Sequence, residues 1–359
     1  MKIKLYISVF FTLLSFGLKA QELYGGIEIG GLGIKSSIIN IKNAESETYE
    51  LNHFWTNDIG LAKNLSKNGL LEKDKINQAF NIVISNFHKM QEEHKIKTGN
   101  IYIVGSSGIK NAKNIDILVD KIRDSIEKSV YLVSTLTESK FLLRGCVTEK
   151  NYANALILDF GGMSVKGGFA IENKNNDNNL KFQSIKLELG TISFTEILNQ
   201  KSGNKLKIEP YLDEIFKYIP ELDKKTATLF NENEQAKTKE NIYLVGGAPW
   251  AYCMLNLDVI NPDFNEMTFK DLKDYEATLK NNFEYYERLA LTNQSVEKVL
   301  KTFNRRQLLA ANTLLISTLE AIGNLDKKKI YFSKRGEVAW LISYVLDSAK
   351  GIKISYDEN

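Results

Sequence analysis

The hydrophobic pattern of the chain predicts strands that alternate with helices. Residues 23–29 and 34–41 are expected to form two strands joined by a glycine-rich turn, because each is a short apolar run beside glycines. A polar stretch follows, and apolar residues then recur at helical spacing between residues 72 and 90. The first half continues with a strand at 101–107, a helix at 115–129, a strand at 130–134 and a helix at 138–147.

The same order starts again at Ala155. The second half is expected to contain strands at 155–159, 165–171 and 180–187, a strand followed by glycines at 241–251, a largely helical region at 269–325, a strand at 329–332 and a helix at 336–349. The asparagine-rich segment "ENKNNDNN" is expected to form a turn. Strands alternating with helices indicate an α/β fold, and the length favours two domains, which we place at residues 21–147 and 148–359.

The two halves begin with similar hairpins, "GIEIGGLGIKSSIIN" at 26–40 and "LILDFGGMSVKGGFA" at 156–170. With an offset of 131 positions, a carboxylate, two glycines and a lysine correspond in the pairs Glu28 and Asp159, Gly30–Gly31 and Gly161–Gly162, and Lys35 and Lys166. Glycine turns let backbone N–H groups approach a phosphate, and a neighbouring carboxylate can hold Mg²⁺. One such hairpin alone is better explained as an ordinary tight turn with a charged residue beside it.

The repetition favours a phosphate site between two lobes, since domain interfaces are where ligand sites concentrate. A third glycine pair, Gly246–Gly247, follows the strand at 241 and is expected either at the floor of the same cleft or as a simple strand-to-helix turn.

Several ordered segments resemble the exopolyphosphatase and guanosine pentaphosphate phosphatase (Ppx/GppA) family, within the actin, Hsp70 and sugar-kinase superfamily. The similar segments are the two hairpins, "DIGLAKNLSKNGLLEKDKI", "VGSSGIKNAKN", "STLTESKFLLRG", "LELGTISFTE" and "VGGAPWA". The resemblance implies two ribonuclease-H-like (actin-like ATPase) domains that flank a central cleft. It also implies a phosphohydrolase, with polyphosphate or a nucleotide polyphosphate as substrate, Mg²⁺ as cofactor and a homodimer as a possible assembly.

The resemblance assigns three catalytic carboxylates. Glu138 is the implied base that orients or deprotonates water, although a glutamate there also suits the first turn of a helix. Glu28 and Asp159 are the implied holders of metal or of its waters. The implied phosphate-binding residues are Gly30, Gly31, Gly33, Lys35, Ser106, Lys110, Gly161, Gly162, Ser164, Gly246, Gly247 and Arg305. A solvated helix start explains Arg305 equally well.

The sequence departs from the family pattern at functional positions. Glu28 stands where the family has Asp. Lys110 stands where the family has a phosphate-binding Arg, and a lysine lacks the bidentate fork of an arginine. Lys166 replaces a glutamate, and this reversal of charge favours an anion over a metal. The Arg-Glu-Gly signature of the family is not visible in "SKRGEVAW".

The N-terminal residues 1–20 read as a secretory signal peptide, since Lys2 and Lys4 precede an apolar run at 5–18 that is short for a bilayer span. An uncleaved anchor is the alternative. Removing these residues removes three lysines and no acids, so the formal charge falls from +3 to 0. No general affinity for nucleic acid or stable membrane insertion is therefore expected after cleavage. Localisation in the periplasm is expected.

Few residues support other kinds of chemistry. The three histidines lie outside every motif, which disfavours a histidine-centred hydrolase or a zinc enzyme. Cys146 and Cys253 are expected to be buried, separate thiols, with a disulfide as the alternative for an exported chain. The leading hypothesis is an exported phosphoanhydride hydrolase. The alternatives are a catalytically impaired phosphate-ligand binding protein on the same fold and a relative of sugar kinases or apyrases.

Overall fold

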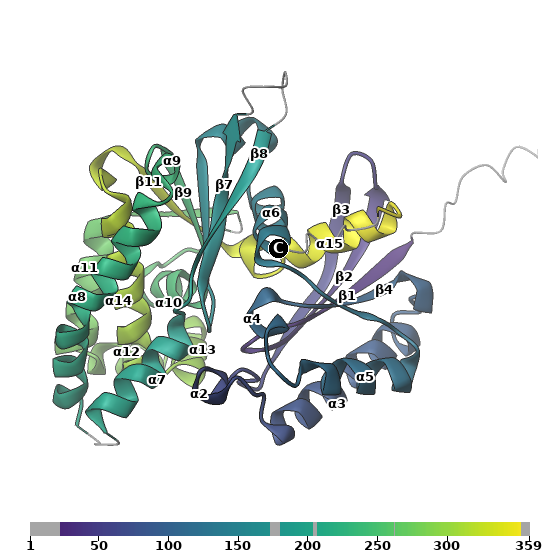
Figure 1. The fold of residues 1–359 in the computed structure, drawn as a ribbon, viewed down its shortest axis with the longest axis horizontal. Helices are drawn as coiled ribbons and strands as arrows, with labels where there is room; N and C mark the ends of the chain where they lie inside the picture. The colour runs from purple at the N-terminus through teal and green to yellow at the C-terminus, as the bar shows by residue number, and fades with distance from the viewer. Residues whose placement is uncertain (1–21, 173–179, 204–206, 262, 353–359) are drawn as a thin grey trace, which may run out of the picture.

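The computed structural model describes residues 22–172, 180–203, 207–261 and 263–352. The expected signal peptide and most of the asparagine-rich segment lie outside these residues. Two β-sheets stand apart in the molecule, each with its own helices, and together they form two lobes (Figure 1). This arrangement is the α/β, two-domain architecture that the sequence predicted.

The first lobe is built on a five-stranded sheet with the order β3-β2-β1-β4-β5. β1 pairs antiparallel with β2 and parallel with β4, and β4 pairs parallel with β5. The strands are β1 (Leu23–Ile29), β2 (Gly33–Asn43), β3 (Thr48–Asp58), β4 (Ile101–Gly105) and β5 (Val130–Leu132). The helices are α2 (Leu65–Asn68), α3 (Lys73–Glu92), α4 (Ser107–Lys110), α5 (Ile115–Ile126) and α6 (Thr135–Cys146).

The second lobe is built on a six-stranded sheet with the order β10-β11-β9-β6-β7-β8. Its strands are β6 (Ala155–Phe160), β7 (Val165–Glu172), β8 (Leu180–Leu187), β9 (Asn241–Gly246), β10 (Phe264–Met267) and β11 (Lys329–Ser333). Its helices are α7 (Thr191–Ser202), α8 (Glu209–Asn231), α9 (Glu234–Lys237), α10 (Gly247–Asn256), α11 (Phe269–Asn281), α12 (Glu284–Leu289), α13 (Gln294–Thr302) and α14 (Arg305–Ile322).

The two sheets repeat one topology. The order β8-β7-β6-β9-β11 has the same strand directions as β3-β2-β1-β4-β5, and β10 is an additional antiparallel edge strand on β11. The repeated hairpins of the sequence are therefore the β1–β2 and β6–β7 hairpins, the first two strands of each lobe. The prediction of a duplicated α/β unit is confirmed.

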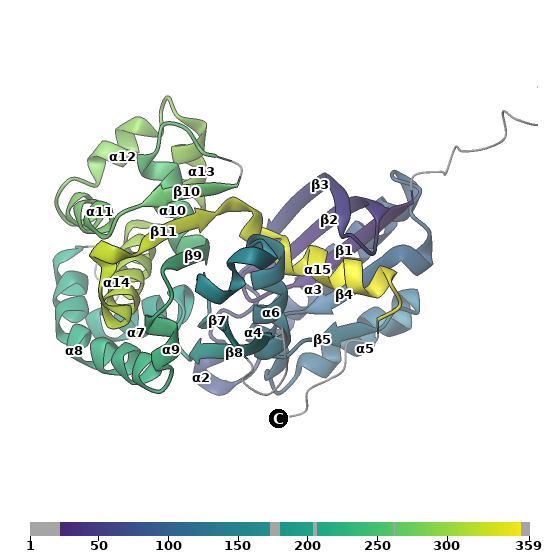
Figure 2. The ribbon, with the colours of Figure 1, turned by 90° about the horizontal axis from the view of Figure 1, so that it is seen from above.

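Two helices form a layer between the sheets. The last helix, α15 (Ala339–Ala349), packs on α6 and on β1, whereas α6 also packs on β7 and β8 of the second lobe. Both views place α6 and α15 between the two sheets (Figures 1 and 2). A buried apolar cluster fills this layer with residues from both lobes, among them Ile39, Phe141, Ile157, Val245 and Leu341. The lobes thus share part of their core.

Local sequence accounts for several helix starts. The hydroxyl of Ser134 accepts the backbone N–H of Thr137 and caps α6. Thr268 and Asn304 form capping boxes at the starts of α11 and α14. The helical region predicted at 269–325 is divided accordingly into α11, α12, α13 and α14, followed by the 3-10 turn η3 (Leu325–Lys327).

A few elements differ from the sequence prediction. β3 lies in the stretch that the sequence analysis describes only as polar. Most of its side chains are exposed at the sheet edge, and backbone pairing with β2 holds the strand in place. The strand expected at 101–107 ends at Gly105, and Ser107 begins α4. The helix expected at 336–349 begins at Ala339, after the 3-10 turn η4 (Lys334–Glu337).

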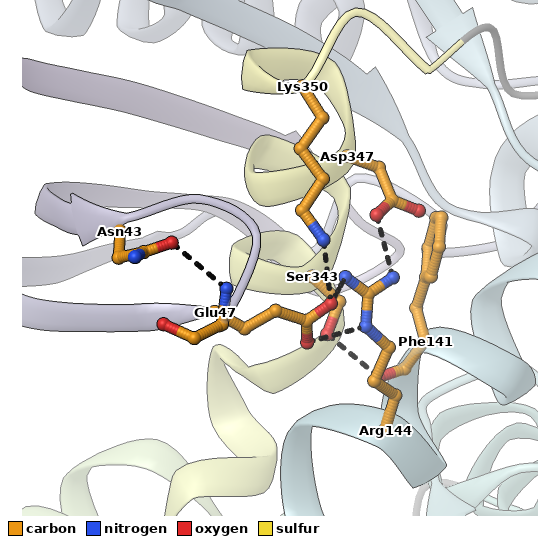
Figure 3. A network of polar contacts seen from close by, with 8 residues as sticks. Asn43, Glu47, Phe141, Arg144, Ser343, Asp347 and Lys350 are labelled. Carbon is orange, nitrogen blue, oxygen red and sulfur yellow. Dashed lines mark hydrogen bonds and ion pairs between the residues drawn. The ribbon is translucent and has the colours of Figure 1, made fainter.

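Ion pairs fasten the β2–β3 hairpin to the layer between the sheets. The Arg144 guanidinium of α6 contacts the Glu47 carboxylate in the hairpin turn and lies 2.7 Å from Asp347 Oδ1 of α15 (Figure 3). Lys350 Nζ lies 3.0 Å from the same Glu47 carboxylate. The end of α15 is thereby held against the first lobe.

Both cysteines are buried free thiols, as expected, and burial raises the pKa of each to about 12. Within the described ranges, no helix combines the length and the apolar composition that crossing a bilayer requires.

Candidate active site

The two hairpin turns have the same internal bond and lie next to each other. We call residues 30–33 the first glycine turn and residues 161–164 the second glycine turn. The N–H of Gly30 donates to the Gly33 carbonyl at 2.8 Å, and at the corresponding positions the N–H of Gly161 donates to the Ser164 carbonyl at 3.1 Å. A Cβ on Gly31 would lie 3.6 Å from Met163 Cγ. The two turns therefore meet at one place between the lobes.

Each hairpin carries a carboxylate and a lysine at directly paired positions. Glu28 pairs across the strands with Lys35, and Asp159 pairs with Lys166. The ammonium nitrogen lies 3.8 Å from Glu28 Oε2 in the first hairpin and 3.7 Å from Asp159 Oδ2 in the second. Opposite charges at such positions stabilise a hairpin, and here they lie directly behind the glycine turns.

Glu138 joins this cluster from the first turn of α6. Its side chain is 2% exposed, and it accepts the backbone N–H of Ser107 at 2.9 Å. Its other oxygen lies 2.5 Å from the Lys166 ammonium, which comes from the opposite lobe. Burial alone would raise the pKa of Glu138, but Lys166 and Ser107 outweigh it and lower that pKa. Glu138 is therefore an ionised carboxylate that already has two partners.

Lys166 is held by carboxylates from both lobes. Its side chain is almost fully buried, between Glu138 and Asp159. Burial favours the neutral amine, but the two carboxylates outweigh burial and raise the pKa of Lys166. Burial also raises the pKa of Asp159, against the opposing effects of Lys166 and Lys35. A positive charge is therefore fixed between carboxylates of the two lobes.

Glu28 has a different environment from Asp159. It is 4% exposed, and its Oε2 atom has no hydrogen-bond partner in the described structure. Burial raises the pKa of Glu28 to about 7, although Lys35 opposes this shift. Its carboxylate therefore gains or loses its proton near neutral pH.

The third glycine pair adjoins the second hairpin. Gly246 ends β9 and pairs with Phe160 of β6, directly after Asp159. Its φ is +94°, and a Cβ there would lie 2.6 Å from the Phe160 carbonyl oxygen and 2.7 Å from Asp159 Oδ1. Only glycine suits this conformation and spacing. Gly247 then begins α10, so this pair belongs to the same site and is also a strand-to-helix turn.

The remaining predicted residues lie at varied positions. Ser106 is buried, and its N–H donates to the Ile29 carbonyl at the end of β1. Lys110 is the last residue of α4 and is half-buried. The Gly162 carbonyl accepts the N–H of Ile192, which fixes the second glycine turn to α7.

Arg305 has partners outside the cluster. Its guanidinium donates to the carbonyls of Leu279 and Lys280 at the end of α11, at 2.9 Å and 2.7 Å. These bonds satisfy carbonyl groups that a helix end leaves open. A phosphate-binding role for Arg305 stays a prediction.

Other charged residues near the turns were missed by sequence reasoning. A cavity of about 520 Å³ is lined by Leu32 of the first glycine turn and by residues of α13, including Lys298 and Lys301. Burial raises the pKa of Glu337 in η4. The nearby positive charges of Lys35 and Lys298 oppose this shift. The signals available in the sequence were the two lysines three positions apart and a glutamate beside Gly336.

The predicted metal ligands do not fit an Mg²⁺ ion held by the protein. Among the described residues, no group of three histidine, cysteine, aspartate or glutamate side chains is placed to hold a metal. Mg²⁺ needs oxygen ligands at about 2.1 Å in octahedral geometry. A lysine ammonium faces each of the carboxylates Glu28 and Asp159, and Lys166 also takes one oxygen of Glu138. The donor set therefore binds ammonium groups.

The fold and the paired glycine turns define a two-lobed α/β protein of the actin-like class. The sequence profile of the Ppx/GppA phosphatase family matches residues 55–337. The chain belongs to the Ppx/GppA phosphatase family.

Solved structures agree in fold. An exopolyphosphatase from Cytophaga hutchinsonii is 16% identical, with 93% of this chain and 100% of that chain covered and a TM-score of 0.72. A Ppx/GppA family member from Aquifex aeolicus is 18% identical, with 93% and 99% covered and a TM-score of 0.66.

Curated relatives match over part of their length. A guanosine-5'-triphosphate,3'-diphosphate pyrophosphatase from Pseudoalteromonas atlantica is 22% identical over 177 residues, which are 49% of this chain and 33% of that protein. A bifunctional 3-dehydroquinate synthase/phosphatase from Fusobacterium nucleatum is 21% identical over 218 residues, 57% of this chain and 32% of that protein. The chain thus matches about a third of the length of these relatives.

Proposed function

We propose that this protein hydrolyses phosphoanhydride bonds and releases phosphate from polyphosphate or a nucleotide polyphosphate. Membership of a phosphatase family supports this proposal. The observation that carries it is the position of Glu138, a buried ionised carboxylate that contacts Lys166 of the second hairpin, whose glycine turn adjoins the first. Relatives named as an exopolyphosphatase and as a guanosine polyphosphate pyrophosphatase indicate the substrate class.

In this mechanism the glycine turns and the lysines bind the terminal phosphates. Backbone N–H groups and the ammonium groups of Lys35 and Lys166 offset the charge on the phosphate oxygens. Water attacks the terminal phosphorus, the bond from that phosphorus to the bridging oxygen breaks, the bridging oxygen stays on the shortened chain as an anion, and orthophosphate is released. Glu138 orients the water and takes its proton, which then passes to solvent. Mg²⁺ has no step here, and a divalent ion that arrives with polyphosphate is part of the substrate.

The contact between Lys166 and Glu138 favours a second candidate. The ammonium occupies an oxygen of the carboxylate that would receive the proton of water. A protein in which this contact persists would bind a phosphate ligand without hydrolysing it. Hydrolysis requires Lys166 to turn from Glu138 to the phosphate when the ligand enters.

Two further expectations from the sequence complete the proposal. We propose that residues 1–20 direct export to the periplasm, where the substrate would be encountered, and that the mature protein forms a homodimer.

The test uses the chain without residues 1–20. It is incubated with polyphosphate or guanosine pentaphosphate, with and without Mg²⁺, and released phosphate is measured. Replacing Glu138 with Gln is expected to lower the rate by about 10²–10⁴-fold, the usual contribution of a positioned base. Glu92→Gln, at a glutamate that is 76% exposed on α3, is the matched control and keeps the rate. Equal rates in both variants would remove Glu138 from the mechanism, and ligand binding without release would favour the second candidate.

A further inference from the structure

Lys166 is the most enclosed cation of the cleft. Its side chain is 7% exposed and lies 2.5 Å from Glu138 Oε1 and 3.7 Å from Asp159 Oδ2. These carboxylates come from opposite lobes, on α6 and on β6. A cation held by carboxylates from two lobes, directly behind two glycine turns, has the surroundings that a phosphate site gives to a divalent metal.

The charges around Lys166 are nearly balanced without any metal. Glu28, Glu138 and Asp159 supply three carboxylates, and Lys35 and Lys166 supply two ammonium groups that contact them. A divalent ion bound by Asp159 or Glu138 would lie within a few ångströms of the Lys166 ammonium, where like charges repel strongly in a buried site. The metal and the ammonium therefore compete for one place.

We propose that Lys166 is the resident cation of this site and takes the place of a protein-bound divalent metal, so that the oligophosphate is held by ammonium groups and backbone N–H groups alone. The choice of an oligophosphate as ligand rests on the proposed function. The role of Lys166 as the cation rests on its own contacts. On ligand entry, Lys166 exchanges its contact with Glu138 for the phosphate oxygens and keeps Asp159 as its neighbouring carboxylate.

Two measurements on the chain without residues 1–20 test this proposal. Binding of inorganic tripolyphosphate is measured by calorimetry in metal-free buffer and again with Mg²⁺. Binding of Mn²⁺, a stand-in for Mg²⁺, is followed by the electron paramagnetic resonance signal of the free ion. The native chain is expected to bind tripolyphosphate equally in both buffers and to leave the Mn²⁺ signal unchanged.

Lys166→Glu reverses both results if the proposal is right. The variant is expected to bind Mn²⁺ and to lose tripolyphosphate affinity in metal-free buffer by about tenfold or more, with partial recovery when Mg²⁺ is added. Lys270→Glu, the same change at a lysine that is 81% exposed on α11, is the matched control and behaves like the native chain. Lys166→Arg keeps the positive charge and is expected to remain independent of metal.

Measurements on the native chain alone can overturn the proposal, even if the Lys166→Glu variant does not fold. A Mn²⁺ site in the native chain, or tripolyphosphate binding that requires Mg²⁺, would show that Lys166 does not replace the metal. A native chain that binds no tripolyphosphate in either buffer would count against the proposed function. The Mn²⁺ measurements on the native chain and Lys166→Glu would still decide the role of Lys166.

Discussion

Glu28 and Asp159 hold equivalent positions in the two hairpins, but their surroundings have diverged. Asp159 is 20% exposed in its side chain and shares Lys166 with Glu138. Glu28 is more deeply buried, and its nearest ammonium stays 3.8 Å away. Burial favours the neutral form of a carboxylate, and at Glu28 this effect outweighs the opposing charge of Lys35. The first hairpin therefore holds a carboxylate whose charge changes near neutral pH.

This difference predicts how stability depends on pH. The pKa of Glu28 is about 7 in the folded protein against an ordinary value of 4.5. The folded state therefore binds this proton more tightly, so the stabilisation is present below about pH 4.5 and is lost as pH rises through 7. The Glu28→Gln variant should lack this loss. Between pH 5 and pH 8, its free energy of unfolding should rise relative to that of the native chain by about 2–3 kcal/mol.

Denaturant unfolding at the two pH values measures the effect. Glu92→Gln, at an exposed glutamate, is the control and should show no such change between the two pH values. A difference between native chain and Glu28→Gln that stays constant from pH 5 to pH 8 would mean that Glu28 is already ionised at pH 5.

At the residue scale, the sequence predicted the identity of the cluster but not its contacts. The offset of 131 positions was enough to relate Glu28 to Asp159 and Lys35 to Lys166. The contact between Lys166 and Glu138 joins two lobes, and no local pattern specifies how lobes are placed. Arg305 shows the same limit, since its carbonyl partners in α11 depend on how two helices pack.

At the scale of elements, the close crossing of α6 and α15 controls the layer between the lobes. A Cβ on Gly145 of α6 would lie 2.7 Å from both the Cβ and the carbonyl oxygen of Ala339. The end of α15 is then fixed by Arg144 through Asp347 (Figure 3). The spacing of the two helices thus depends on a residue without a side chain.

Gly145→Ala tests this crossing. Alanine in a helix normally gains about 1 kcal/mol over glycine, whereas overpacking typically costs about 1–3 kcal/mol and the obstacle here includes backbone. We therefore expect a net loss of free energy of unfolding, measured with urea. Gly99→Ala is the matched control, because nothing lies within 4 Å of a Cβ there. A gain in stability at Gly145 would show that α15 moves aside easily.

The elements themselves were largely predictable, and the misses have physical causes. The strand limits of both hairpins were correct to within two residues, because alternating apolar runs end at glycine turns. β3 was missed because most of its side chains are exposed, and β10 because it is only four residues long; backbone pairing with β2 and β11 defines these two strands. The breaks between α11, α12, α13 and α14 were not specified in the prediction, although Asn293 and Asn304 cap two of these helices.

At the scale of the whole molecule, the shared layer makes the two lobes depend on each other. Leu341 of α15 is fully buried among residues from both lobes. Leu272 of α11 is equally buried but belongs to the core of the second lobe alone. Truncating a buried leucine to alanine lowers the free energy of unfolding by about 2–5 kcal/mol at either position. The two substitutions are therefore expected to differ only in which lobe they destabilise.

This contrast gives the last prediction. With Trp340 replaced by Phe, Trp55 reports on the first lobe and Trp250 on the second, since each packs beside the core of its own lobe. Leu341→Ala is expected to lower the unfolding midpoints of both tryptophan signals together, whereas Leu272→Ala should lower the Trp250 midpoint more than the Trp55 midpoint. If Leu341→Ala moved only the Trp55 signal, α15 would serve the first lobe alone. The cluster of Glu138, Asp159 and Lys166 would then depend on its own ion pairs, rather than on the shared layer, to keep the glycine turns together.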